Sequence, residues 1–199
     1  FIGALSVNTP DGFLYKVDAR LRPGGKNDVL CLPMEGYREY YTQRIRTWEK
    51  QALTRLRFIG GDEKLGQKFI QMVEGILFCR GLSTAEVQEI QAMRERMTKE
   101  KVPLDQKGDH VKLDAGGIVD VEFAVQLLAL HWGWKYPALR HGTTLEILDR
   151  AWNIGLLSKS RLKVFQDGYA FLRSIENKIR MVSGLPTEAI AQDENGQYA

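Results

Sequence analysis

The stretch GGIVDVEFAVQLLALHW, residues 116–132, decides the fold class that the sequence predicts. Its two glycines allow a sharp turn before a helix, and the free N–H groups and positive dipole end of a helix start favour Asp120 in the first turn. Glu122 and Gln126 lie one turn apart in an otherwise almost entirely apolar helix, which is typical of a helix buried on most sides. Because unpaired buried acids are costly, we expect arginines from a neighbouring helix or from the N-terminal part to meet these acids.

Helical patterns continue on both sides of this stretch. Apolar residues recur every three or four positions from Tyr37 to Ile59. Ser83 or Thr84, with Glu86 in the first turn, predicts a capped helix start, and similar start and stop residues bound the other segments. The predicted helices are residues 33–59, 63–78, 84–101, 118–132, 144–155 and 159–183. Residues 111–114 are predicted to be a short extended piece.

The predicted β structure is confined to the N-terminal end. Residues 2–7 and 13–21 have the pattern of two strands around the turn formers of residues 8–12, and residues 29–32 that of one more short strand. The composition changes near Pro33, where the period becomes helical. The sequence therefore predicts a mostly α protein, with a small β-hairpin followed by a helical bundle.

Composition disfavours several classes of protein. The chain has 199 residues and a formal net charge of +3, and its basic residues are dispersed among acids, which disfavours nucleic-acid binding. The two cysteines form no motif, and the three histidines lack ligand spacing, so neither a disulfide framework nor a zinc site is indicated. No apolar run is long enough to span a bilayer. We expect a cytoplasmic protein, and, because the chain starts at Phe1 without methionine, a fragment of a longer one.

The predicted strand YKVDARLRP, residues 15–23, carries the first candidate site. Side chains alternate along a strand, so Asp18, Arg20 and Arg22 share one face. An acid beside two arginines can hold a metal ion while the guanidinium groups bind phosphate oxygens. The alternative interpretation is an ion-pair ladder on a sheet edge.

Two helical segments carry further candidates. In residues 48–57, WEKQALTRLR, the side chains of Glu49, Arg55 and Arg57 are predicted to line a polar face that points at the β part; the alternative is a solvated charged face. In residues 112–123, KLDAGGIVDVEF, the alternative to a functional role is a capped core helix with one internal ion pair. The two glycines lack the spacing of either a Walker loop or a dinucleotide fingerprint.

Read together, four blocks resemble the glutamine synthetase adenylyltransferase family, in order along nearly the whole chain. The blocks are residues 15–23, 48–57, 112–123 and 169–177. The resemblance implies a bifunctional enzyme with two similar halves, each a nucleotidyltransferase domain followed by a helical domain. Residues 1–62 would be the C-terminal part of the first domain, and residues 63–199 a helical domain of the PII-uridylyltransferase-like type.

The family pattern assigns expected roles to individual residues. Three carboxylates hold magnesium in such folds, and Asp18 matches the last of them, so the other two would lie upstream of Phe1. Arg20 and Arg22 would lie near the phosphates of ATP. The supporting residues would be Lys112, Asp120, Glu122, Glu49 and Arg55.

The implied activity is transfer of AMP from ATP to a tyrosine of glutamine synthetase, which regulates nitrogen assimilation. PII signal protein and glutamine would act on the full-length enzyme. Residues 48–53, WEKQAL, favour the adenylylating half. The alternatives are the deadenylating half, which removes AMP by phosphorolysis, and a non-catalytic helical module that binds PII or glutamine synthetase.

Overall fold

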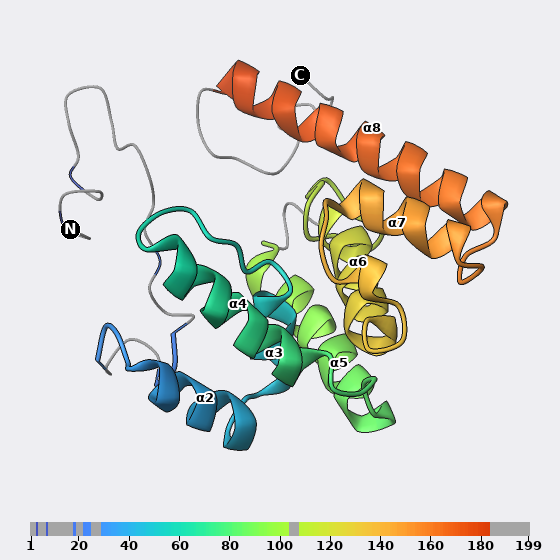
Figure 1. The fold of residues 1–199 in the computed structure, drawn as a ribbon. Coiled ribbons are helices and arrows are strands. Elements are labelled where there is room, and N and C mark those ends of the chain that lie inside the picture. Colours follow the sequence, from blue (N-terminus) through green and yellow to red (C-terminus); the bar gives the residue numbers. More distant parts are fainter. Residues whose placement is uncertain are drawn as a thin grey trace.

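The computed structural model describes residues 29–103 and 108–183, together with Gly3, Val7, Asp18 and residues 22–24. This part of the chain holds seven α-helices and one short 3-10 helix (Figure 1). They are α2 (Met34–Gln43), α3 (Thr47–Leu53), α4 (Glu63–Leu77), α5 (Thr84–Lys101), α6 (Ile118–Trp132), η3 (Pro137–Leu139), α7 (Thr144–Asn153) and α8 (Lys159–Ser183). The prediction of a mostly α protein is confirmed for these residues.

Helix α6 is the element around which the others pack. It contacts α3 and α5 on one side and η3, α7 and α8 on the other (Figure 1). Six of its residues are buried: Ile118, Val119, Val121, Val125, Ala129 and Leu130. The prediction of a helix buried on most sides is therefore confirmed, with the predicted bounds.

Two apolar clusters meet at α6. The first joins α2 and α4 to Ile90 of α5 and Leu130 of α6. The second joins Val121 and Val125 of α6 to η3, α7 and the first half of α8. Each fully buried leucine or isoleucine contributes roughly 1.5–3 kcal/mol through removal from water. Helix α6 therefore ties the two halves of the helical body together.

The helix predicted over residues 33–59 is two helices, so that prediction is wrong in its bounds. The chain leaves the helix after Gln43 and re-enters it at Thr47. The Glu49 carboxylate accepts hydrogen bonds from the Arg46 backbone N–H and from the Tyr40 hydroxyl, each 2.8 Å long. Glu49 therefore caps the start of α3 and fastens it to α2.

The other predicted helices agree with the structure to within two residues. Ser83 is the N-cap of α5 and Thr143 that of α7, and in each case the hydroxyl accepts from the N–H three residues later. The Ser158 hydroxyl accepts from the Arg161 N–H, at 3.3 Å, at the start of α8. The caps in the sequence thus located these helix starts correctly.

The predicted β structure is not seen. Residues 29–32 are irregular, so the short strand predicted there is wrong. The predicted hairpin, residues 2–21, lies outside the described residues apart from Gly3, Val7 and Asp18, none of which is in a strand. In the described ranges, no helix is long and apolar enough to cross a membrane.

Candidate functional site

A tight turn leads into α6. The N–H groups of Leu113 and Asp114 both donate to the His110 carbonyl, and the Asp114 carboxylate accepts from the N–H groups of Gly108 and His110, at 2.9 and 2.8 Å. The Asp114 side chain thus closes the backbone on itself. The extended piece predicted for residues 111–114 is therefore wrong.

The two glycines before α6 are both required by this turn. Gly116 has a φ of +81°, which disfavours residues with a side chain. A Cβ on Gly117 would lie 2.7 Å from the Val111 carbonyl oxygen. The predicted sharp turn is confirmed. The amides of Ile118 and Val119 donate to the Val111 and Lys112 carbonyls, at 3.2 and 3.1 Å, so these N–H groups are occupied and unavailable to a phosphate.

Asp120 is held by a buried arginine from α5. Arg94 Nε donates to Asp120 Oδ1 at 2.6 Å, and Arg94 Nη2 donates to the carbonyls of Leu113 and Asp114 at 2.9 and 3.2 Å. The other Asp120 oxygen accepts from the Gly116 N–H at 2.6 Å. A single guanidinium group therefore joins α5, the turn and α6, and the expected arginine partner for Asp120 is confirmed.

Glu122 is held from two further directions. Arg55, just beyond α3, places Nη2 3.3 Å from Glu122 Oε2, and the Tyr169 hydroxyl of α8 donates to Glu122 Oε1 at 3.2 Å. Arg173 lies over the Tyr169 ring, at 6.0 Å, and forms an ion pair with Glu176 at 2.7 Å. The structure therefore brings together residues from three of the four blocks that the sequence singles out.

Polar side chains also join α3 to α5 and α6. We call this set of contacts the polar seam; its hydrogen bonds are Thr47–Glu89 at 2.5 Å, Lys50–Glu86 at 2.5 Å and Gln51–Gln126 at 2.6 Å. Partial burial alone would raise the pKa of Glu86, but hydrogen bonds from Arg80, Lys50 and Ser83 outweigh it and hold the pKa well below its usual range. Glu86 is therefore ionised at neutral pH within the seam.

The sequence predicts that Glu49 shares a polar face with Arg55 and Arg57, and this prediction is wrong. Glu49 is 4% exposed and turns inward to Tyr40, whereas both arginines are exposed. Burial, with the hydrogen bond to Glu49, raises the pKa of Tyr40. The contact with Glu49 thus belongs to the junction of α2 and α3.

The remaining predicted site residues are described only in part. Asp18 is exposed, and Arg22 and Lys112 are half-buried, while Arg20 lies outside the described residues. Within the described ranges, no three His, Cys, Asp or Glu side chains lie close enough to hold a metal ion. These residues alone therefore do not form a magnesium site, and the roles of Asp18, Arg20 and Arg22 stay predictions.

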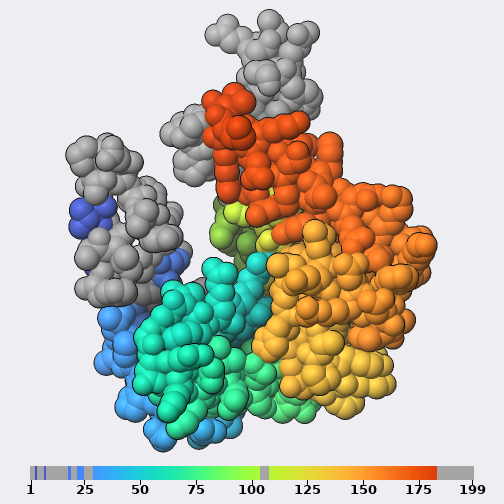
Figure 2. Space-filling model, turned by 45° about the horizontal axis from the view of Figure 1, so that its top comes forward, coloured from blue at the N-terminus to red at the C-terminus, as the bar shows by residue number. Residues whose placement is uncertain are grey.

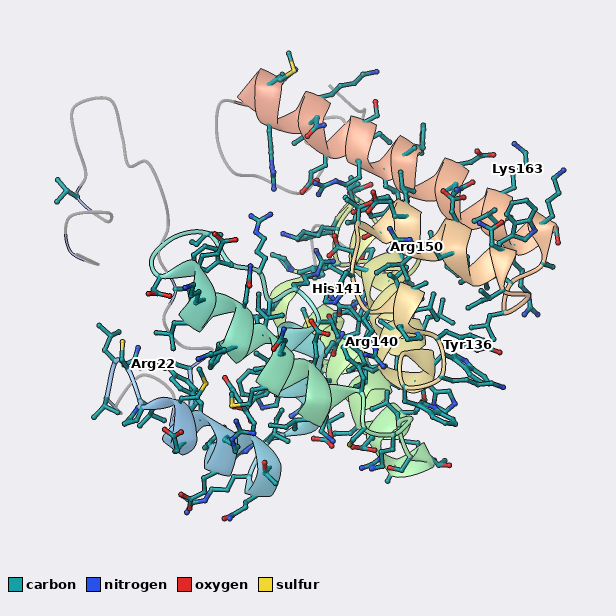
Figure 3. The ribbon with its side chains drawn as sticks, in the orientation of Figure 1. Arg22, Tyr136, Arg140, His141, Arg150 and Lys163 are labelled. Carbon is teal, nitrogen blue, oxygen red and sulfur yellow. The ribbon has the colours of Figure 1, made fainter. Side chains whose placement is uncertain are left out.

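A cavity of about 610 Å³ lies beside the Arg55–Glu122 pair. The segment after α3, helix α6 and the start of α7 form its walls, and the four basic side chains that line it are Arg55, Arg57, Arg140 and His141. Figure 3 shows Arg140 and His141 near the middle of the molecule, in the segment that leads into α7. Sequence reasoning missed these last two residues, although RHGTT, residues 140–144, places two basic side chains shortly before a helix cap.

Comparisons with known proteins give consistent matches. A family model described as glutamate-ammonia ligase adenylyltransferase matches residues 1–72, and one described as GlnD PII-uridylyltransferase matches residues 85–199.

Curated relatives include bifunctional glutamine synthetase adenylyltransferase/adenylyl-removing enzymes. Those of Streptomyces coelicolor and Streptomyces avermitilis are 34% and 35% identical to this chain. The matches cover 95% and 89% of this chain, and 19% and 18% of the respective relative. That of Haemophilus ducreyi is 30% identical over 98% of this chain and 21% of its own length. The chain thus spans about a fifth of the length of these relatives.

Proposed function

Because the chain belongs to the glutamine synthetase adenylyltransferase family, we propose that it is a segment from one half of a bifunctional enzyme that regulates glutamine synthetase. In this proposal, residues 1–62 are the end of a nucleotidyltransferase domain, and residues 63–199 are the helical domain that follows it. The two successive family matches support this order. The enzyme would act in the cytoplasm on glutamine synthetase, with PII and glutamine as regulators.

The observation that carries the proposal is the contact between α3 and α6. The Arg55–Glu122 ion pair and the Gln51–Gln126 hydrogen bond join the 48–57 block to helix α6, at the end of the 112–123 block. Arg94 fixes the turn before α6 through Asp120 and two carbonyls. The role proposed for Asp120, Glu122 and Arg55 is therefore a supporting one. They would hold the end of α3 in one position against α6.

The chemistry proposed is nucleotidyl transfer. Such reactions depend on positioning and on neutralising phosphate charge, for which metal ions supply positive charge when bound. Asp18 would be one carboxylate ligand of magnesium, and the guanidinium groups of Arg20 and Arg22 would contact the phosphates of ATP. The remaining metal ligands would come from residues outside this chain.

We propose the adenylylating half, which moves AMP onto a tyrosine hydroxyl of glutamine synthetase, because residues 48–53 favour it. The second candidate is the deadenylating half. It shares the same fold and the same family matches, so an assay must distinguish the two.

The test is Asp18→Asn in the whole polypeptide that contains this segment. AMP addition to glutamine synthetase and AMP removal from it are measured separately. We expect loss of addition with removal retained. Loss of removal alone would assign the deadenylating half, and retention of both activities would overturn the catalytic role of Asp18. Asp167→Asn, which alters an exposed ion pair on α8, is the matched control and should leave both activities intact.

The isolated 199-residue chain should not transfer AMP, because it would supply only one of the expected metal carboxylates. Incubation with labelled ATP, magnesium and glutamine synthetase tests this. Incorporation of label above that of a heat-denatured sample would contradict the proposal that the other ligands lie elsewhere.

A further inference from the structure

The cavity beside Arg55 has the size and lining of a small-molecule site. Ligand pockets in proteins typically enclose about 300–1,000 Å³, with apolar walls and a few placed polar groups. This cavity encloses about 610 Å³, and Leu56, Val125, Ala129 and Ile147 form its apolar walls. The basic groups therefore stand at the edge of an apolar space, as a ligand with one charged end would require.

Two of the four basic side chains already have acidic partners. Arg55 lies 3.3 Å from Glu122, and His141 Nε2 lies 3.0 Å from Glu74. Glu146, which also lines the cavity, accepts from the Thr143 N–H at 2.7 Å in the cap of α7. Each of these three acids is therefore bound to a defined partner.

Arg57 and Arg140 can each form an ion pair with a bound anion. Within the described part of the chain, neither forms an ion pair with an acid. Arg140 Nε donates to the Gly133 carbonyl at 2.8 Å, and its guanidinium group lies 5.2 Å from the centre of the Phe78 ring. Because arginine carries five N–H donors, the outer nitrogens of Arg140 remain available while its stem is fixed.

The wall that carries Arg140 and His141 is held in place before any ligand binds. Arg150 of α7 donates to the backbone carbonyls of Ala138 and His141, and Figure 3 shows Arg150 on α7 close to this segment. The start of α7, with Thr143 and Thr144, faces the same cavity. A preformed wall reduces the entropy lost on binding.

We propose that this cavity binds a small organic anion. Its phosphate or carboxylate group is held by the guanidinium groups of Arg57 and Arg140, and its apolar part contacts Val125 and Ile147. Arginine forks recognise the oxygens of both groups, so the two share one chemistry. The inference rests on the cavity alone and is independent of the function proposed above.

The experiment is isothermal titration calorimetry, in which each anion is titrated into the 199-residue chain. One arm uses phenyl phosphate and inorganic phosphate, and the other uses benzoate and acetate. We expect saturable binding in at least one arm, tighter for the aromatic anion than for its small counterpart, because the aromatic ring fills the apolar space. The arm that binds identifies the phosphate or the carboxylate as the preferred group.

Arg57→Gln is the decisive variant, because Arg57 is exposed and its loss should leave the fold intact. Loss of a hydrogen bond to a charged group should weaken binding about tenfold. Arg161→Gln removes an exposed arginine from α8, outside the cavity lining, and should not change binding. Absence of saturable binding in both arms, or equal affinity of the wild type and Arg57→Gln, would overturn the proposal.

Discussion

The two sides of α6 are held by different kinds of contact. On the side of α3 and α5, charged and amide side chains form the polar seam and the Arg94–Asp120 pair. On the side of α7 and α8, Leu139, Leu148 and Ala151 are each 0% exposed, and the contact is mainly apolar, with the Tyr169–Glu122 hydrogen bond as its polar member. Figure 2 shows α7 and α8 (orange to red) as one continuous side of the surface, next to that of α4 (teal).

The two kinds of contact should contribute differently to the stability of the fold and to the position of its helices. Apolar contacts are non-directional and scale with buried area, whereas a hydrogen bond works only at a short distance and a suitable angle. The apolar side should therefore supply most of the free energy of folding. The polar side should fix the register of α3 against α5 and α6, where the residues of the candidate site lie.

The largest effect is expected from Leu148→Ala on the apolar side. Leu148 is 0% exposed, so its truncation leaves a cavity and should lower the free energy of unfolding by about 3 kcal/mol. Urea denaturation of both proteins measures this. The control is Val164→Ala on α8, which is 72% exposed and should change stability by less than about 0.5 kcal/mol. Equal effects of the two substitutions would show that α7 is not part of a packed core.

Arg94→Met on the polar side should cost less, roughly 2 kcal/mol, because it leaves Asp120 and two carbonyls without their shared donor. The long methionine side chain retains most of the apolar packing of the arginine stem. The same urea denaturation measures the loss.

A second variant separates the charge from the packing. If the cost arises from the uncompensated carboxylate, then Asp120→Asn should destabilise Arg94→Met less than it destabilises the wild type. Additive effects of the two substitutions would contradict direct coupling through the ion pair.

The starts of α5, α7 and α8 could be predicted because the residues that cap each helix lie within one turn of its start. Ser83 and Thr143 each cap a helix through the N–H three residues later, and a glutamate at that third position completes the cap. The boundaries of α6 followed from two glycines and an apolar run. A cap or a turn residue acts within one turn of helix, so the sequence displays it directly.

The break between α2 and α3 was not predicted, because its N-cap is Arg46, not one of the usual cap residues, and because Tyr40 of α2 also holds Glu49. The apolar period continues through Tyr41, Ile45 and Trp48 and therefore favours one helix. The buried contact of Glu49 with Tyr40 and with the Arg46 N–H outweighs that preference. The sequence suggested arginine partners for Asp120 and Glu122, but it could not identify Arg94 and Arg55, because these come from other segments of the fold. It missed Arg140 and His141 because their cavity forms only when the segment after α3 meets α6 and the start of α7.

A smaller effect should appear in the pH dependence of the polar seam. Because the folded-state pKa of Glu86 is lowered, its contribution to stability is complete above its ordinary pKa of about 4.3 and decreases as the pH falls below that value. Glu86→Gln should therefore lower the free energy of unfolding by about 1.5 kcal/mol at pH 7 and by less at pH 3. Denaturation curves at both pH values measure this. Glu95→Gln, at an exposed position on α5, is the control and should show little effect at either pH. A larger loss at pH 3 than at pH 7 would contradict the sign.

The smallest effect tests whether burial, and not the length of the contact, sets the value of an ion pair. Lys50–Glu86 in the seam and Lys163–Asp167 on α8 have similar distances, 2.5 and 2.7 Å, but the exposed fractions of their side chains are 19% and 13% in the first pair and 77% and 64% in the second. Water and salt screen the exposed pair. Lys163→Met should leave the melting temperature unchanged, whereas Lys50→Met should lower it by about 3 °C, the shift expected for about 1 kcal/mol in a chain of this size. Differential scanning calorimetry measures the melting temperatures of both variants. Equal decreases in melting temperature would mean that the polar seam is as well solvated as the outer face of α8.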